Sequence, residues 1–285
     1  MTYGDCHIHG WEPGTWSQMK SSMVQVIVIV ALAAACSAQY NADAIIQRSV
    51  AANAADWSAA PDYEYLERDV QQKGGTKTFK ELVILGSPYE LLIAVNGNAL
   101  SPEQQKQEQA KLEAAVVERQ GESPQARAQR IAKYEAERKR DHLLMEQLTK
   151  ALDFELVGEQ RLGPFKVYVL KATPRPGYVP PNFEAKVLTG MEGKLWIDEK
   201  TFQWVKVEAT VIDPVSIAGF LAQVEPGTHF ELQKMPVAEG VWLPKHFAMK
   251  SQAKVLFFFT RKSQADETYY RYQKSTPVQA GVGDK

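Results

Sequence analysis

Cysteine is almost absent from this chain of 285 residues, which contains only Cys6 and Cys36. Both precede or fall within segment 19–38, which has the features of a secretory leader. The segment has a basic residue near its start, Lys20, then a run over 23–35 that is apolar apart from one glutamine, and it ends in small side chains. Cleavage at the end of such a leader removes every cysteine. The exported part then has no internal disulfide, no cysteine nucleophile and no cysteine-bound zinc.

A long hydrophobic run is also missing. A helix that spans a membrane needs about 20 apolar residues, so the shorter run over 23–35 predicts a cleaved signal peptide at 19–38. Residues 1–18 precede that leader and are interpreted as upstream sequence that is not native to the protein. Cys36 leaves two alternatives open, because a lipid on it would tether the protein to a membrane, whereas cleavage after Ala38 would release it. We favour cleavage after Ala38, and both alternatives predict a periplasmic location.

Neither sign of charge dominates. The chain has 33 Lys and Arg against 34 Asp and Glu, and removal of residues 1–38 takes away one lysine and two acidic residues. The mature chain is therefore close to neutral. It has no overall field that would attract nucleic acid or an anionic surface, so neither is expected as a partner.

The motifs of hydrolytic and phosphoryl-transfer chemistry are absent. The chain has no Gly-x-Ser-x-Gly elbow, no phosphate-binding glycine-rich loop and no His-Glu-x-x-His pair. His7 and His9 resemble the metal-binding opening of amidohydrolases, but no apolar strand precedes them and the leader follows. His229 is interpreted as a strand residue. We therefore predict no catalytic residue, no metal and no cofactor. A hydrolase of unrecognised type remains an alternative, and it predicts clustered carboxylates with perturbed pKa values in a cleft.

Two helical regions are predicted. Residues 41–56 form an amphipathic pattern whose apolar stripe includes Ile45, Ile46 and Val50. A helical hairpin is expected over 101–152, since Ser101 is a good N-cap followed by proline and, at the third helical position, glutamine. Basic side chains gather on its second helix, but acidic ones are interleaved, so we interpret the group as a solvated helix face. The basic residues are Arg127, Arg130, Lys133, Arg138, Lys139 and Arg140.

Most of the remaining chain has the period of β-strands. Ten to twelve short strands in meander spacing predict an α+β fold, in which a curved antiparallel sheet forms a half-barrel with the N-terminal helix and the hairpin packed on it. Short strands are expected at 241–243, 246–251 and 254–261, among others. Segment 203–212 has one polar face, whereas 165–170 and 255–259 are apolar on both faces. Strands of the second kind must be covered on both sides, by more protein or by an apolar ligand.

Large aromatic side chains are frequent in the strands. They could line an apolar cleft, although most such residues belong to a core in folded proteins. The candidates for a ligand cleft are Trp196, Trp204, Phe220, Trp242, Phe247, Phe257 and Phe259.

The order of these parts resembles the LolA/LolB-like lipoprotein-carrier superfamily, which also includes RseB-type and LppX-like domains. The resemblance rests on a leader, a first amphipathic helix, a strand meander with a helical insertion, the strand pair 193–198 and 203–208, and segment 240–244. It implies one domain over 39–285, with an eleven-stranded half-barrel whose concave side is plugged by helices. It also implies that acyl chains of a lipid or lipoprotein bind in that half-barrel. The long insertion at 101–152 departs from the carriers.

Two alternatives to an acyl-chain carrier follow from the same sequence. A protein-interaction or sensor domain of RseB type would have an envelope protein as its partner. It predicts a well-filled cleft and an exposed apolar patch on the hairpin. The unrecognised hydrolase instead predicts the clustered carboxylates described above.

Overall fold

A computed structural model describes residues 42–216, 222–255 and 259–275 of the chain. The predicted signal peptide, residues 1–18 and the candidate lipidation site Cys36 lie outside the described residues. So do the cleft candidates Phe220 and Phe257, and the side chain of Phe259.

The described strands form one antiparallel sheet with the order β4-β3-β2-β1-β13-β12-β11-β8-β7-β6-β5. Two short strands lie off this path, where β10 pairs with β12 and with β9. The strands are β1 (Tyr63–Val70), β2 (Thr76–Ile84), β3 (Ser87–Val95), β4 (Asn98–Ala99), β5 (Leu152–Leu162), β6 (Phe165–Pro174), β7 (Met191–Asp198), β8 (Trp204–Val211), β9 (Val215–Ser216), β10 (Ala222–Val224), β11 (His229–Ala238), β12 (Val241–Val255) and β13 (Phe259–Lys274).

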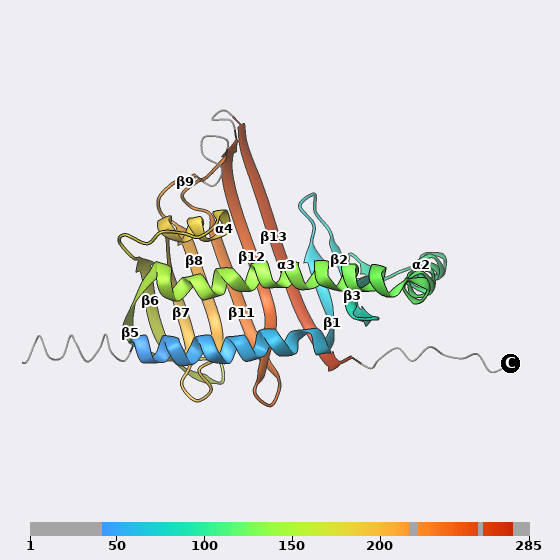
Figure 1. Ribbon diagram of the computed structural model, residues 1–285, viewed down its shortest axis with the longest axis horizontal. Coiled ribbons are helices and arrows are strands. Elements are labelled where there is room, and N and C mark those ends of the chain that lie inside the picture. Colours follow the sequence, from blue (N-terminus) through green and yellow to red (C-terminus); the bar gives the residue numbers. More distant parts are fainter. Residues whose placement is uncertain (1–41, 217–221, 256–258, 276–285) are drawn as a thin grey trace, which may run out of the picture.

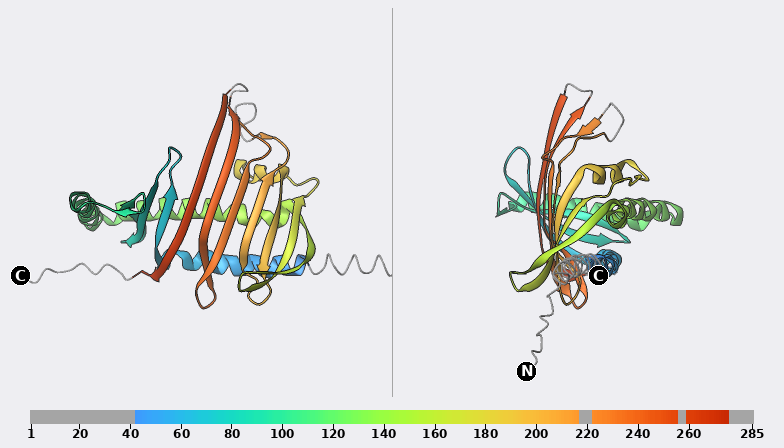
Figure 2. Two further views of the ribbon diagram at one scale, coloured as in Figure 1. Left: turned by 180° about the vertical axis from the view of Figure 1, so that it is seen from behind. Right: turned by 90° about the vertical axis from the view of Figure 1, so that its left-hand side faces the viewer.

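Two long helices lie side by side across one face of this sheet (Figure 1). One is the N-terminal helix, residues 42–59, which continues into the 3-10 turn η1 (Ala60–Asp62). The other is α3 (Pro124–Ala151), which follows α2 (Pro102–Gly121) in the insertion between β4 and β5. A short helix, α4 (Phe183–Lys186), and the turn η2 (Val187–Gly190) precede β7. The view from behind and the end view in Figure 2 show both long helices on the same side of the curved sheet. This face is called the helix-covered face below, and the opposite one the outer face.

The predicted fold class is confirmed. The protein is α+β, with an open curved antiparallel sheet of eleven strands in its main path, an N-terminal helix and a helical insertion packed on it. The predicted start of the insertion is also confirmed, because Ser101 and Gln104 form a reciprocal capping box. His229 lies in β11, as expected.

The main core lies under the β5–β8 half of the sheet. Ile45 and Ile46 of the N-terminal helix pack there against buried residues of the helix-covered face, such as Leu170 and Ile197. A smaller cluster lies on the outer face, where Val167 and Val169 of β6 meet Val205 and Trp242. Strand β6 is therefore covered on both sides by protein, as its two apolar faces predicted.

The predicted short strands near the end of the chain are wrong. Segments 241–243, 246–251 and most of 254–261 belong to two long strands, β12 of 15 residues and β13 of 16 residues. Pro244 does not end β12, because it lies at a shift in the pairing register with β11, where Gln233 pairs with His246 and Lys234 with Pro244. A proline lacks an N–H donor and is tolerated at such an irregularity.

The interpretation of the basic residues on α3 as a solvated face is wrong for two of them. Arg130 donates hydrogen bonds to the Ser87 hydroxyl at 2.6 Å and the Leu85 carbonyl at 3.2 Å, and it pairs with Glu122 at 2.7 Å. Arg138 donates to the backbone carbonyl of Trp57. Acceptors such as backbone carbonyls and the Ser87 hydroxyl follow no periodic pattern in the sequence, so these hydrogen bonds could not be predicted from it. The lysines on the same helix, Lys133 and Lys139, are exposed as expected, and so is Arg140.

Candidate functional site

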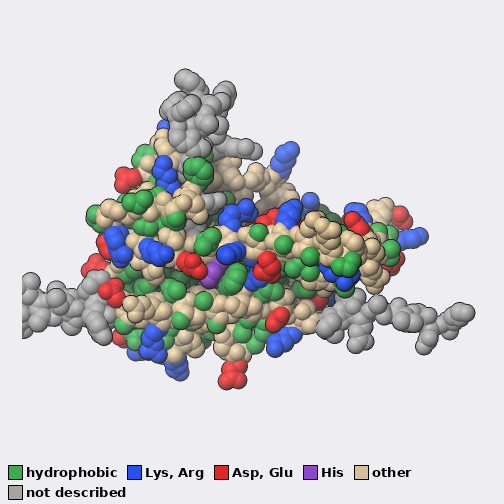
Figure 3. Space-filling view, viewed as in Figure 1, with side chains coloured by type: hydrophobic (Ala, Val, Ile, Leu, Met, Phe, Trp, Pro, Cys, Tyr) green, Lys and Arg blue, Asp and Glu red, His purple; other side chains and the backbone are tan. Residues whose placement is uncertain are grey.

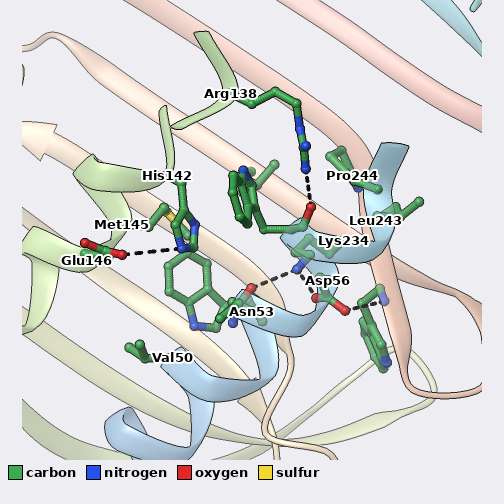
Figure 4. A pocket seen from close by; sticks show the side chains of 16 residues that line it. Val50, Asn53, Asp56, Arg138, His142, Met145, Glu146, Lys234, Leu243 and Pro244 are labelled. Carbon is green, nitrogen blue, oxygen red and sulfur yellow. Dashed lines mark hydrogen bonds and ion pairs between the residues drawn. The ribbon is translucent and has the colours of Figure 1, made fainter. Parts of the chain in front are cut away.

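A cavity of about 450 Å³ lies between the N-terminal helix, α3 and strands β8, β11 and β12 (Figure 4). This volume falls within the roughly 300–1,000 Å³ typical of small-molecule sites. We call the cavity the helix–sheet pocket. Its apolar lining comes from helices and strands alike and consists of Val50, Ala54, Trp57, Ala60, Met145, Trp204, Leu232, Trp242, Leu243 and Pro244; its polar lining consists of Asn53, Asp56, Arg138, His142, Glu146 and Lys234.

A buried polar network lies at the inner side of the pocket. Lys234 of β11 forms an ion pair with Asp56 and donates to the Asn53 side chain at 2.8 Å. The other Asp56 oxygen accepts hydrogen bonds from Gln203 at 3.0 Å and from the Trp242 backbone N–H at 2.8 Å. Asp56 is 3% exposed and Lys234 is 9% exposed. Burial lowers the pKa of Lys234, and the adjacent Asp56 carboxylate opposes that shift. The network fastens the N-terminal helix to the sheet.

An aromatic contact joins the two helices at the pocket. The rings of Trp57 and His142 stack with centroids 4.4 Å apart and an angle of 17°. The Arg138 guanidinium lies 4.6 Å from the centre of the Trp57 ring. His142 Nε2 lies 3.7 Å from a carboxylate oxygen of Glu146. Figure 4 shows Arg138 and His142 reaching from α3 toward the N-terminal helix, so a ligand that enters between the helices at this point would meet these side chains.

Figure 3 shows the same boundary from outside. Hydrophobic side chains gather in the seam between the N-terminal helix and α3, and charged ones of both signs are spread along the outer side of α3. Hydrophobic side chains therefore reach the surface between the two helices that bound the pocket.

The structure places the predicted cleft aromatics in different surroundings. Trp204 and Trp242 line the pocket, and each is 4% exposed. Trp242 also packs at 4.8 Å against Phe165 in the outer cluster. Trp196 belongs to that outer cluster as well, with Lys206 5.5 Å from its ring centre. Phe247 is half-buried and pairs in register with Leu232, but it does not line the pocket.

Sequence reasoning missed the lining residues that come from the helices. Val50, Ala54 and Trp57 recur at helical spacing on the N-terminal helix, and so do Arg138, His142 and Met145 on α3. Each stripe can be read from the sequence. The sequence does not show that these two stripes, about 80 residues apart in the chain, face each other, because only the packing of the insertion on the sheet brings them together.

A second cavity, of about 280 Å³, adjoins the first and shares Ala60, Leu243 and Pro244 with it. We call it the tyrosine pocket. Five tyrosines and one carboxylate dominate its lining, which is completed by three prolines and three aliphatic residues. The lining residues are Tyr63, Tyr65, Tyr134, Tyr269, Tyr272, Glu81, Ala60, Pro61, Val83, Pro88, Leu243 and Pro244. The Tyr65 ring lies 5.8 Å from that of Tyr269 and 5.1 Å from that of Tyr272.

Carboxylates on this part of the helix-covered face have perturbed pKa values. Burial raises the pKa of Glu81 to about 7, and Glu90 and Glu67 add to the shift while Arg119 opposes it. Burial likewise raises the pKa of Glu67 to about 7, with further contributions from Glu267, Glu90 and Asp69. The hydrolase alternative predicted clustered, perturbed carboxylates. Within the described ranges, however, no three His, Cys, Asp or Glu side chains are arranged to hold a metal ion.

No protein-family model and no curated protein sequence matches the chain. Among solved structures, the chain is similar to a candidate outer membrane lipoprotein-sorting protein domain from Vibrio parahaemolyticus, at 11% identity and a TM-score of 0.34, over 85% of this chain and 95% of that one. It is similar to a DUF1329 family protein from Desulfovibrio piger at 10% identity and a TM-score of 0.33, over 85% and 94% of the two chains.

A third similarity is to a chain of the MucA/MucB complex of Pseudomonas aeruginosa, at 10% identity and a TM-score of 0.21, over 80% of this chain and 99% of that one. Superpositions at this level do not identify a ligand, a partner or an activity. The function is therefore argued from the pockets. None of the helices in the described residues is both long enough and apolar enough to cross a membrane.

Proposed function

We propose that this protein binds the acyl chains of a lipid or lipoprotein in the helix–sheet pocket and acts as a non-catalytic carrier or lipid-handling protein of the periplasm. The observation that carries the proposal is the apolar lining of a 450 Å³ cavity that lies between two helices and a sheet. The polar groups in this lining have partners within the protein. Asp56 pairs with Lys234, and His142 lies beside Glu146.

The energetics of chain burial support this proposal. Each methylene group that leaves water for an apolar site contributes roughly 0.8 kcal/mol. A ten-carbon segment therefore gains about 8 kcal/mol, from which the cost of ordering the ligand must be subtracted. The remainder is sufficient for binding without a covalent bond or a catalytic step, and release requires only that α3 and the N-terminal helix separate.

The two alternatives have less support. An interaction domain predicted an apolar patch on the hairpin, and the one large apolar side chain of α2 and α3 that is strongly exposed in the described residues is Val117, at 67%. A hydrolase predicted perturbed carboxylates in the cleft. Glu67 and Glu81 fit that description, but neither lines the helix–sheet pocket, and both lie among tyrosines and further carboxylates.

The proposal is tested by native mass spectrometry, with lipid extraction, of the protein exported from its own leader. We expect a stoichiometric acyl lipid to copurify and added dodecanol to compete with it. The mature mass also shows whether the chain begins at Cys36 or after Ala38.

A matched pair of variants locates the site. Ala54 lines the helix–sheet pocket, whereas the next residue, Ala55, is exposed on the same helix. Ala54→Phe fills the pocket and should weaken dodecanol binding at least tenfold, whereas Ala55→Phe should leave it unchanged. A clean apo mass with no uptake of any chain, or equal effects of the two variants, contradicts the proposal.

A further inference from the structure

We propose that the tyrosine pocket holds the positively charged head group of the amphiphile whose chain lies in the helix–sheet pocket. The inference rests on the proposed function, and it adds the chemical class of the ligand: a long-chain amphiphile with an ammonium or quaternary ammonium head. Neither pocket suggests this class alone, because it depends on how the two are joined and how their charges are balanced.

The two pockets are adjacent, because part of their lining is shared. Ala60, at the start of η1, and Leu243 and Pro244, in β12, line both cavities. A chain that lies along Leu232 and Trp204 in the helix–sheet pocket can therefore continue past these three residues into the tyrosine pocket.

The buried charges of the helix–sheet pocket are compensated within the protein, and its exposed carboxylate, Glu146, lies 3.7 Å from the His142 ring nitrogen. The ammonium of Lys234 is paired with Asp56 and bonded to Asn53. The Arg138 guanidinium binds Glu135 at 3.0 Å and the carbonyl of Trp57. A charged head placed there would compete with partners that are already in position, and it would lose its own hydration. The apolar part of the ligand suits this pocket better.

The tyrosine pocket has the opposite character. Aromatic rings present a negative face that attracts a cation within about 6 Å of the ring centre. The hydroxyl groups of Tyr269 and Tyr272 are already bonded, to Glu267 and to the Pro244 carbonyl, so their rings are held in place. Glu81 contributes a carboxylate to the wall, and the lining of this cavity includes no lysine or arginine.

The surrounding carboxylates increase the need for a cation. Strand pairing places Glu81 opposite Tyr65 and Glu90, and Glu67 opposite Tyr269, so these carboxylates share the helix-covered face. Arg119 of α2, which opposes the pKa shift of Glu81, donates to the carbonyls of Ile84, Ser87 and Pro88. Burial raises the pKa of Glu81, and this excess of negative charge raises it further. An ammonium group in the pocket would offset the negative charge.

The test compares three probes with the same twelve-carbon chain: dodecyltrimethylammonium, dodecanol and dodecanoate. Binding is measured by calorimetry at pH 8, below the concentrations at which the probes form micelles. We expect the cation to bind at least about tenfold more tightly than the neutral and anionic probes, which corresponds to about 1.4 kcal/mol.

Variants separate the head-group site from the chain site. Glu81→Gln keeps the shape of the side chain and should reduce the cation preference to less than about threefold. Tyr269→Leu should reduce it too, by removal of an aromatic face. Glu155→Gln makes the same charge change at an exposed position of β5 and should have no effect. Ala54→Phe should weaken all three probes equally, because it acts on the chain.

The outcomes are distinguishable. If the three probes bind equally well, or dodecanoate binds most tightly, the head-group assignment is overturned while the proposed function stands. The same holds if Glu81→Gln and Glu155→Gln behave alike. If no probe binds, the proposed function itself fails.

Discussion

Lys234 is the most completely buried cation among the described side chains that line the helix–sheet pocket, and its environment decides how it contributes to stability. It forms contacts with both Asp56 and Asn53 of the N-terminal helix from a strand near the middle of the sheet. A buried ion pair seldom stabilises a protein more than a well-packed apolar pair does, but the loss of one partner leaves a buried charge without compensation. This pair therefore holds the helix in one position rather than adding a large net stability.

The first prediction concerns this pair. Asp56→Asn should lower the free energy of unfolding by about 3–5 kcal/mol, because it leaves the buried Lys234 without a counter-charge. Urea denaturation at pH 7 measures the change. The double variant Asp56→Asn with Lys234→Met should recover part of the loss, since no buried cation remains. A loss below about 1 kcal/mol in the single variant would show that the pair is solvated in solution.

The carboxylates near the tyrosine pocket give a pH-dependent prediction. The pKa of Glu81 is raised from 4.5 to about 7, so the folded protein binds a proton on this group more readily than the unfolded chain does. The resulting stabilisation is present at pH 4.5 and below, and it is lost as the pH rises toward 7. Glu81→Gln should therefore raise the melting temperature more at pH 8 than at pH 5. Thermal melts of both proteins across this range measure the difference, and Glu155→Gln is the control. An equal shift at both pH values contradicts the prediction.

At the scale of elements, the two ends of α3 are held differently: Met145, Leu148 and Ala151 pack on the apolar core, whereas the part near the β2–β3 turn is anchored through arginine side chains. Arg119 of α2 donates to the carbonyls of Ile84 and Ser87, and Arg130 of α3 donates to the Leu85 carbonyl and the Ser87 hydroxyl. That turn requires Gly86, whose φ is 90° and where an added Cβ atom would lie 2.9 Å from Ile131 of α3. The turn and the hairpin thus fit together through hydrogen bonds and one close contact.

The third prediction tests this anchoring. Arg130→Met should cost about 1–3 kcal/mol, because it leaves partly buried acceptors on Ser87, Leu85 and Glu122 without their donor. Hydrogen exchange should become faster in the β2–β3 turn and in α2. Lys133→Met changes an exposed residue of the same helix and should leave both the stability and the exchange unchanged. Equal behaviour of the two variants would mean that apolar packing holds the hairpin.

Some elements could be predicted from the sequence and others could not. The capping box at Ser101, the apolar stripe of Ile45 and Ile46 and the two-sided burial of β6 all followed from local patterns, because period and capping chemistry act over a few residues. The continuity of β12 past Pro244 did not follow, since it depends on a register shift opposite another strand. The anchoring role of Arg130 left no pattern in the sequence, because two of its acceptors, the Leu85 carbonyl and the Ser87 hydroxyl, belong to a turn some 45 residues away.

The candidate site was predictable only in part. Trp204 and Trp242 were identified as aromatic strand residues and do line the helix–sheet pocket. Trp196 has the same residue type on a neighbouring strand but packs on the outer face. A one-residue shift within a strand exchanges the two faces. The pairing of Trp196 with Lys206 and of Ile197 with Trp204 leaves Val205 as an extra residue in β8, so Trp204 packs in the main core and Val205 in the outer cluster. Sequence alternation alone cannot locate such shifts.

At the scale of the whole molecule, the layer of two helices acts as a cover over the sheet. The contact between them at the pocket is small and depends on Trp57, His142 and Arg138. The polar network at Asp56 holds the N-terminal helix to the sheet, so α3 is the helix expected to move when a ligand enters.

The fourth prediction concerns this motion. Trp57→Ala removes the ring on which His142 and Arg138 pack, and it should raise the rates of both uptake and release of a fluorescent long-chain probe by about tenfold or more, with a smaller change in affinity. Stopped-flow mixing measures both rates. His142→Phe keeps an aromatic stack on Trp57 and should exchange the probe at nearly the original rate. Unchanged kinetics in Trp57→Ala would place the entrance elsewhere.

The pairing of β13 with both β1 and β12 has a consequence for how the protein folds. Strands β1–β4 have no partner in the rest of the sheet until β13, the last strand described, is in place. The outer edge of β1 therefore waits for some two hundred residues of chain before it is paired, and an unpaired edge can associate with other chains. Pairing between such distant segments slows folding, because the entropy of closing a long loop is lost before the contact forms.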